Sequence, residues 1–113
     1  MTPDEFAEIA RDAPESEPGG HQGADDFRVR KKIFATLDRQ TGVGALKLTP
    51  EEQGLLMAAS AAFYPANGTW GARGWTKVRL AEAADNDVRA GVNMAWANVA
   101  PKSLLKLYED QSD

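Results

Sequence analysis

The chain has 113 residues, no cysteine, 42% hydrophobic residues and a formal net charge of −4. These values predict one soluble domain with a single core, and they exclude disulfides, thiolate metal sites and a cysteine nucleophile. No apolar run approaches the roughly 18 residues that span a bilayer, and the acidic start lacks the basic and apolar regions of a secretory signal. We therefore expect a cytoplasmic protein with no membrane contact.

A helix is expected first, because Thr2-Pro3-Asp4-Glu5 has the pattern of a capping box with proline at the first helical position. Its apolar stripe comprises Phe6, Ile9, Ala10 and Ala13, and Pro14 ends it. Residues 14–26 are rich in Pro, Gly, Ser and acids, which predicts a flexible connector. The lone histidine, His21, lies in this segment and is expected to be solvated rather than a metal ligand.

Residues 27–37 are predicted to form strands around which the rest of the chain is organised. Phe27 and Val29 alternate with Arg28 and Arg30, and a second alternation sets Ile33, Ala35 and Leu37 against Phe34 and Thr36. Lys31 and Lys32 mark a bend between the two halves. Residues 38–44 have the composition of a hairpin loop, and residues 45–49 are expected to pair as an antiparallel strand.

A second capping box at residues 49–52 predicts a short helix with an apolar stripe of Leu55, Leu56 and Ala59. Residues 60–74 read as a loop. Residues 75–80 alternate again, which predicts a strand with Thr76, Val78 and Leu80 on one face and Trp75, Lys77 and Arg79 on the other.

The last third is predicted to be helical. Asp85 or Asn86 is expected to cap a helix whose apolar stripe includes Val88, Val92 and Trp96, and Trp96 is expected in the core. Pro101 breaks this helix. A final short helix is expected to point Leu104, Leu107 and Tyr108 inward, and the tail at 109–113 is expected to fray.

Three segments in this order resemble the MmcQ/YjbR family: residues 27–37, residues 46–52, and Trp70-Gly71 through Gly74-Trp75 to Leu80. Ala100-Pro101-Lys102 adds to the resemblance, which covers about residues 5–108. It implies a CyaY-like α+β two-layer sandwich, in which an N-terminal helix and C-terminal helices pack on one face of an antiparallel sheet. Members are commonly described as DNA-binding. The family usually has glycine where this chain has Lys31.

Charge is unevenly distributed along the chain. Residues 1–27 hold one basic and eight acidic residues, residues 28–80 hold nine basic and three acidic, and residues 81–113 hold three basic and six acidic. A basic middle between acidic ends is typical of an anion-binding surface, although charges in a folded protein also sort by element. The pI of about 5.0 lies far from the basic balance of a dedicated nucleic-acid binder.

Taken with the resemblance, these features predict a non-enzymatic DNA-binding module that contacts phosphates through a basic sheet face. One alternative is a protein-interaction or small regulatory module that uses the same face and the aromatics Phe63, Tyr64 and Trp70. Another is that the basic face is merely solvated. The predicted nucleic-acid-binding residues are Arg28, Arg30, Lys31, Lys32, Lys47, Arg73, Trp75, Lys77 and Arg79.

No catalytic residue, metal or cofactor is expected. Asp4, Glu5, Glu8 and Asp12 cluster as in the iron-binding first helix of frataxin-like proteins, but this spacing is also that of an ordinary solvated helix face. No carboxylate lies in an apolar sequence setting that would raise its pKa for acid–base catalysis. A monomer is the default expectation, because the sequence has no evident dimerisation seam.

Overall fold

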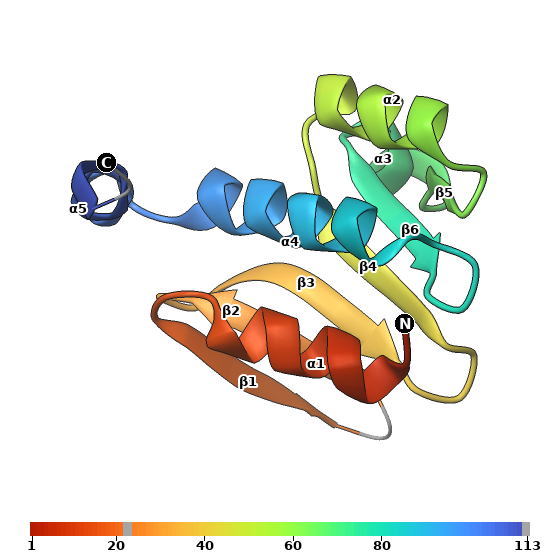
Figure 1. Ribbon diagram of the computed structural model, residues 1–113, viewed down its shortest axis with the longest axis horizontal. Coiled ribbons are helices and arrows are strands. Elements are labelled where there is room, and N and C mark those ends of the chain that lie inside the picture. The colour runs from red at the N-terminus through yellow and green to blue at the C-terminus, as the bar shows by residue number, and fades with distance from the viewer. Residues whose placement is uncertain (22–23, 112–113) are drawn as a thin grey trace.

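The computed structural model describes residues 1–21 and 24–111, which form a six-stranded antiparallel sheet with helices packed against it (Figure 1). The predicted α+β fold is therefore confirmed. The strand order is β1-β2-β3-β4-β6-β5. The strands are β1 (Ser16–His21), β2 (Ala24–Val29), β3 (Lys32–Asp38), β4 (Val43–Lys47), β5 (Phe63–Pro65) and β6 (Trp75–Arg79). The helices are α1 (Pro3–Asp12), α2 (Pro50–Ala59), α3 (Gly68–Ala72), α4 (Asp85–Val99) and α5 (Lys102–Gln111).

The helices α1 and α4 lie side by side over one face of the sheet, and α2 lies next to α4 (Figure 1). The core fills the space between this layer and the strands. Its largest fully buried side chains include Phe6 of α1, Phe27 and Phe34 of β2 and β3, and Val88 and Val92 of α4. We call this the helix-covered face of the sheet and the opposite one the open face.

Both capping boxes form as predicted. Thr2 and Thr49 each accept a hydrogen bond from the backbone of the glutamate three residues later, and that glutamate accepts one in return. The hydrogen bonds from Thr2 lower the pKa of Glu5 below its usual value, because they favour the ionised carboxylate. The alternation of β6 is also confirmed, since Thr76 and Val78 are buried while Trp75, Lys77 and Arg79 are not.

The prediction of a flexible connector at residues 14–26 is wrong. Residues 16–21 form the edge strand β1, which pairs along its whole length with β2. An edge strand tolerates Pro18 and two glycines, because its backbone alone makes the pairing. The predicted solvation of His21 concerns a side chain outside the described part of the structure. The tail prediction is wrong for residues 109–111, which continue α5, whereas residues 112–113 lie outside the described part.

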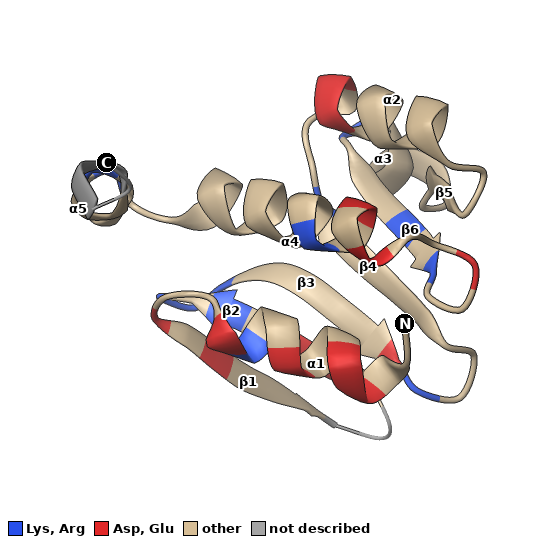
Figure 2. Ribbon diagram, in the orientation of Figure 1, with Lys and Arg blue, Asp and Glu red and all other residues tan. Residues whose placement is uncertain are grey.

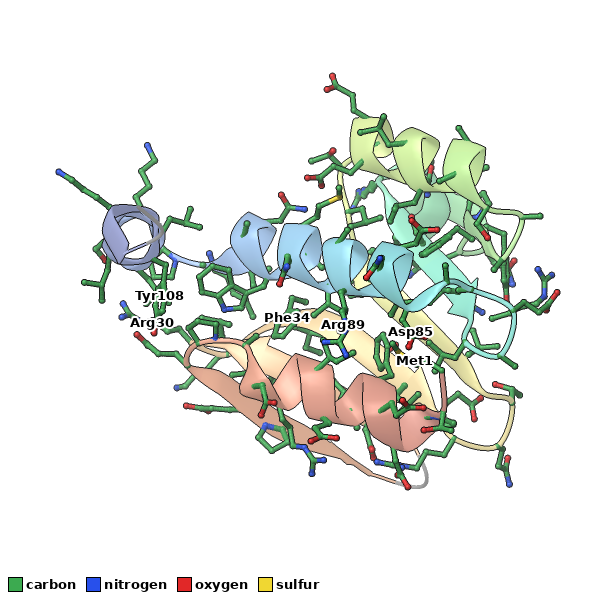
Figure 3. All side chains as sticks on the ribbon, in the orientation of Figure 1. Met1, Arg30, Phe34, Asp85, Arg89 and Tyr108 are labelled. Carbon is green, nitrogen blue, oxygen red and sulfur yellow. The ribbon has the colours of Figure 1, made fainter. Side chains whose placement is uncertain are left out.

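The prediction of which β3 side chains share a face of the sheet is wrong at the start of the strand. Phe27 pairs with Ala35 and Arg28 pairs with Ile33, so Phe34 is an extra residue in a β-bulge. As a result Phe34 and Ala35 are both buried on the helix-covered face, and Ile33 turns to the open face. Figure 3 shows Phe34 between α1 and α4. The bend lies at Arg30 and Lys31, one residue earlier than predicted.

Several smaller predictions also fail in the second half. Residues 60–74 contain β5 and α3 rather than a loop alone. The N-cap of α4 is Ala84, which makes no side-chain capping bond. Two predicted apolar stripes are only partly buried: Leu55 is exposed on α2, and Leu107 and Tyr108 are exposed on α5, although Leu56 and Leu104 are buried. Trp96 is buried as predicted, and its indole Nε1 donates to the carbonyl of Pro14.

The exposed side chains of α5 agree with its position, since this helix lies beyond the end of α4 and away from the sheet (Figure 1). Among residues 1–21 and 24–111, no helix is both long and apolar enough to cross a bilayer.

The β2–β3 turn carries local backbone strain. Arg30 and Lys31 have φ values of 49° and 74°, the left-handed region that glycine adopts without a steric penalty. We expect Lys31→Gly to raise the free energy of unfolding by about 0.5–1 kcal/mol in urea denaturation. Lys31→Ala, which removes the charge but keeps Cβ, should give no such gain, and equal stabilisation by both substitutions would show that charge rather than backbone strain is responsible.

Candidate functional site on the open sheet face

The open face is built from alternate residues of the six strands. The strand pairing places Asp26, Thr36, Ala45, Lys77 and Tyr64 in one row across β2, β3, β4, β6 and β5. Further along the strands, the pairs Arg28–Ile33 and Lys47–Trp75 lie on one side of this row, and the pair Val43–Arg79 lies on the other side. The centre of the face therefore holds the small side chains of Thr36 and Ala45, with larger side chains around them.

A hollow of about 370 Å³ lies on this face beside β6, and we call it the tryptophan hollow. The rings of Trp70 and Trp75 meet edge to face, with centroids 6.4 Å apart and an interplanar angle of 78°. Trp70 comes from α3, and 62% of its surface is exposed. The hollow is lined by Ile33, Thr36, Ala66, Asn67, Trp70, Trp75 and Lys77.

Lys77 lies next to Ala45 on the open face, on strand β6. It lines the tryptophan hollow and also a second hollow of about 340 Å³, which has Tyr64, Ala45 and Val43 on one side and Asp38 on another. Its side chain is half-buried, and within the described residues its ammonium makes no ion pair. A partly desolvated, unpaired cation between two hollows is suited to an anionic ligand.

The other predicted cations fall into two groups. Three are engaged: Arg28 is held by both carboxylate oxygens of Asp26, Arg30 pairs with Glu15, and Arg79 lies over the Tyr64 ring with Glu82 3.7 Å from its Nε. The hydrogen bonds that Arg28 donates to the Asp26 carboxylate raise the pKa of Arg28. Lys31, Lys32, Lys47 and Arg73 make no ion pair with a described residue.

The predicted residues do not form one site. Arg28, Lys47, Trp75, Lys77 and Arg79 share the open face, and Arg73 follows α3 two residues before Trp75. Arg30, Lys31 and Lys32 lie apart, at the β2–β3 turn, where Figure 2 shows a basic cluster separate from that on β6. The open face is thus divided: the cations that make no ion pair with a described residue lie on the β4–β6 side, while the β1–β2 side carries Glu17 and the Arg28–Asp26 ion pair.

Hydrogen bonds from Gln53, Thr76 and Ala66, most of them to backbone carbonyls, position the tryptophan hollow. Gln53 Nε2 lies 3.1 Å from the Gly71 carbonyl, 3.2 Å from the Trp75 carbonyl and 3.1 Å from Thr76 Oγ1. Thr76, the one buried polar side chain of the described core, donates to the Gly74 carbonyl at 2.8 Å. The backbone N–H of Ala66 donates to the Trp75 carbonyl. Together these bonds hold α3 against the start of β6.

The nine predicted residues omit several that line the hollows. Tyr64 and Trp70 are obvious aromatics, but the predicted loop at 60–74 gave them no face. Ile33 was predicted to share one face of its strand with Ala35 and Leu37, an alternation that the bulge interrupts. Asn67 is the N-cap of the five-residue helix α3 and makes no capping hydrogen bond. Because α3 and β5 are so short, no sequence periodicity reveals them.

Two of the acidic residues of α1 are engaged: Glu5 completes the capping box, and Asp4 pairs with a cation from the β3–β4 loop. Arg39, from the β3–β4 loop, hydrogen-bonds to Asp4 and also to Asp25 of β2, and both bonds raise the pKa of Arg39. Among residues 1–21 and 24–111, no three His, Asp or Glu side chains are placed to hold a metal ion. These ion pairs tie α1 to the sheet on the side away from the open face.

Comparisons with known proteins agree with this architecture. The family model described as YjbR matches residues 3–98. The structure of protein DR2400 from Deinococcus radiodurans, described as carrying a DUF419 domain, superposes with a TM-score of 0.74 at 18% identity, covering 91% of this chain and 81% of that one. A Pseudomonas syringae protein gives a TM-score of 0.70 at 17% identity, covering 88% and 100%. No curated protein matches.

Proposed function

The chain belongs to the YjbR family, and we propose that it is a non-enzymatic module that binds DNA through the open face of its sheet. The observation that supports this proposal most strongly is Lys77, which is half-buried, makes no ion pair within the described part of the chain, and lies beside the aromatic walls of Trp70 and Trp75. Cations that contact phosphate and aromatic rings that contact bases are the two elements of nucleic-acid binding that does not depend on sequence.

The free cations near this hollow set the expected strength of binding. Lys77, Lys47 and Arg73 make no ion pair with a described residue, whereas Arg28 and Arg79 would first lose the contacts described above. Three phosphate contacts correspond to modest affinity and to a slope of roughly −2 to −3 for the logarithm of the binding constant against the logarithm of salt concentration. No recognition helix is presented on the open face, so we expect little sequence preference.

We expect the double variant Lys47→Ala/Lys77→Ala to bind labelled DNA at least tenfold more weakly than the wild type in fluorescence anisotropy at low salt. Its salt slope should also be shallower by roughly 1.5 to 2, because two phosphate contacts are lost. The control is Arg89→Ala, which also removes a cation but one that lies on α4, on the helix-covered side of the sheet (Figure 3). Equal loss of affinity in the control, or none in the double variant, would contradict the proposed interface.

A protein-interaction module remains the alternative, and one observation favours it. Trp70 exposes 62% of its surface beside an apolar hollow, and exposed tryptophans are frequent anchors of protein interfaces. The two functions differ in their salt dependence, because an interface that relies on aromatic anchors weakens little with salt. Absence of DNA binding even at low salt would favour the protein partner.

A further inference from the structure

We infer that the ligand of the open face is a single-stranded nucleic acid, and that one unpaired base stacks in the tryptophan hollow. This inference rests on the proposed function and deepens it by naming the strandedness of the ligand and the subsite for the base. Three observations support it: the shape of the hollow, the polar groups around the hollow, and the distribution of charged residues across the open face.

The shape of the hollow suits an isolated aromatic ring. Trp70 and Trp75 meet at 78°, so their rings form two walls at nearly a right angle, and Ile33 and Thr36 lie at the base. Its volume of about 370 Å³ lies in the range of sites for small planar ligands. A base within a duplex is stacked on both faces and paired at its edge, so it cannot enter such a hollow without leaving the helix.

The polar groups around the hollow complement a nucleotide. Lys77 lines the hollow, and Lys47 pairs across the strands with Trp75, so cations flank the position where phosphates on either side of a stacked base would lie. Asn67 lines the hollow with an amide that makes no capping hydrogen bond, and an amide offers both a donor and an acceptor to a base edge. None of the described lining residues is acidic.

The distribution of charge favours a narrow ligand over a wide one. Adjacent strands lie about 4.8 Å apart, so the β4–β6–β5 half of the open face is roughly 10 Å wide. A single strand fits within this half. A duplex, whose major groove alone is about 12 Å wide, would extend over β2 and β1 and bring its phosphates towards Asp26 and Glu17. The cation of β2, Arg28, is already held by Asp26 and lies opposite Glu17, so a duplex would gain no unpaired cation from the described residues of β1 and β2.

The test compares three labelled probes on the full chain by fluorescence anisotropy: an oligothymidylate of about ten nucleotides, an oligouridylate of the same length and a duplex of the same length. We expect the single strands to bind at least tenfold more tightly than the duplex and to quench the tryptophan fluorescence. The two single strands separate a DNA ligand from an RNA ligand. We expect Trp70→Ala to weaken single-strand binding roughly 5- to 150-fold, as loss of one stacked base does.

Trp70 is largely exposed, so Trp70→Ala should retain the fold, which circular dichroism verifies, and Arg89→Ala again serves as the control. Duplex binding as tight as single-strand binding, or an unchanged affinity of Trp70→Ala while Lys77→Ala is weakened, would overturn this inference and leave the proposed function standing. Failure of all three probes to bind at low salt, or an unchanged affinity of Lys77→Ala, would overturn the proposed function itself.

Discussion

Replacing Gly74 with alanine is expected to lower the free energy of unfolding by roughly 3–5 kcal/mol or to prevent folding. Gly74 has φ near +115°, a conformation that residues with a side chain rarely adopt. A Cβ at this position would lie 2.0 Å from the Leu48 carbonyl oxygen and 2.8 Å from its carbon. These are backbone atoms at the end of β4, so no side chain can move to relieve the clash. Urea denaturation measures the loss.

Gly54→Ala is the matched control for this prediction. Gly54 lies in the interior of α2, and a Cβ there would meet nothing within 4 Å. The substitution should raise the free energy of unfolding by about 0.5–1 kcal/mol, because alanine favours the helix. A Gly74→Ala variant that unfolds within 1 kcal/mol of the wild type would mean that the close approach of β6 to Leu48, which positions Trp75, is not present in solution.

Replacing Phe34 with alanine is expected to lower the free energy of unfolding by about 3–5 kcal/mol, the usual cost of removing a buried phenylalanine. Phe34 is fully buried between the sheet and the helices α1 and α4 (Figure 3). Its neighbour Ile33 faces the open side and is half-buried, so Ile33→Ala should cost only about 1 kcal/mol. Both variants are compared by urea denaturation.

The pair of variants tests the bulge directly. Simple alternation along β3 would bury Ile33 and expose Phe34, and it would therefore reverse the order of the two effects. A larger loss of stability for Ile33→Ala than for Phe34→Ala would show that β3 runs without the bulge. In that case Ile33 would also be absent from the tryptophan hollow.

Elements with a strong local signal could be predicted from the sequence. The two Thr-Pro-Asp/Glu-Glu segments form the capping boxes that start α1 and α2, because a cap depends only on residues within one turn. The strand β6 and the buried Trp96 were likewise evident, since both follow a regular period. These predictions needed no information about distant parts of the chain.

Features that depend on pairing between strands could not be predicted. β1 has the composition of a loop, and only its hydrogen bonds to β2 make it a strand. The bulge at Phe34 arises from the register of β3 against β2, which no pattern within β3 records. The short elements β5 and α3 contain only three and five residues, too few to repeat a recognisable pattern, so Tyr64 and Asn67 had no assigned face.

The sequence predicted which residues of β6 share a face in the candidate site, but not which of the predicted cations are held by other side chains. The alternation at residues 75–79 correctly placed Trp75, Lys77 and Arg79 on one face. It did not show that Arg79 is held by Tyr64 and Glu82, because Tyr64 comes from the neighbouring strand β5 and Glu82 from the turn after β6. It also did not show that Arg28 is held by Asp26, two residues earlier on β2, because Asp26 was assigned to the connector. Of the cations predicted for this face, Lys77, Lys47 and Arg73 are therefore the ones that make no ion pair with a described residue.

The central claim, that the open face binds single-stranded nucleic acid, is tested most directly by a ¹⁵N–¹H NMR titration of the full chain with oligothymidylate. We predict that the shifted amides and the indole N–H signals belong to Trp70, Trp75 and the strands β4 and β6, while α1 and α4 remain unchanged. Shifts confined to the β2–β3 turn or to the helix-covered side, or no shifts at low salt, would contradict it.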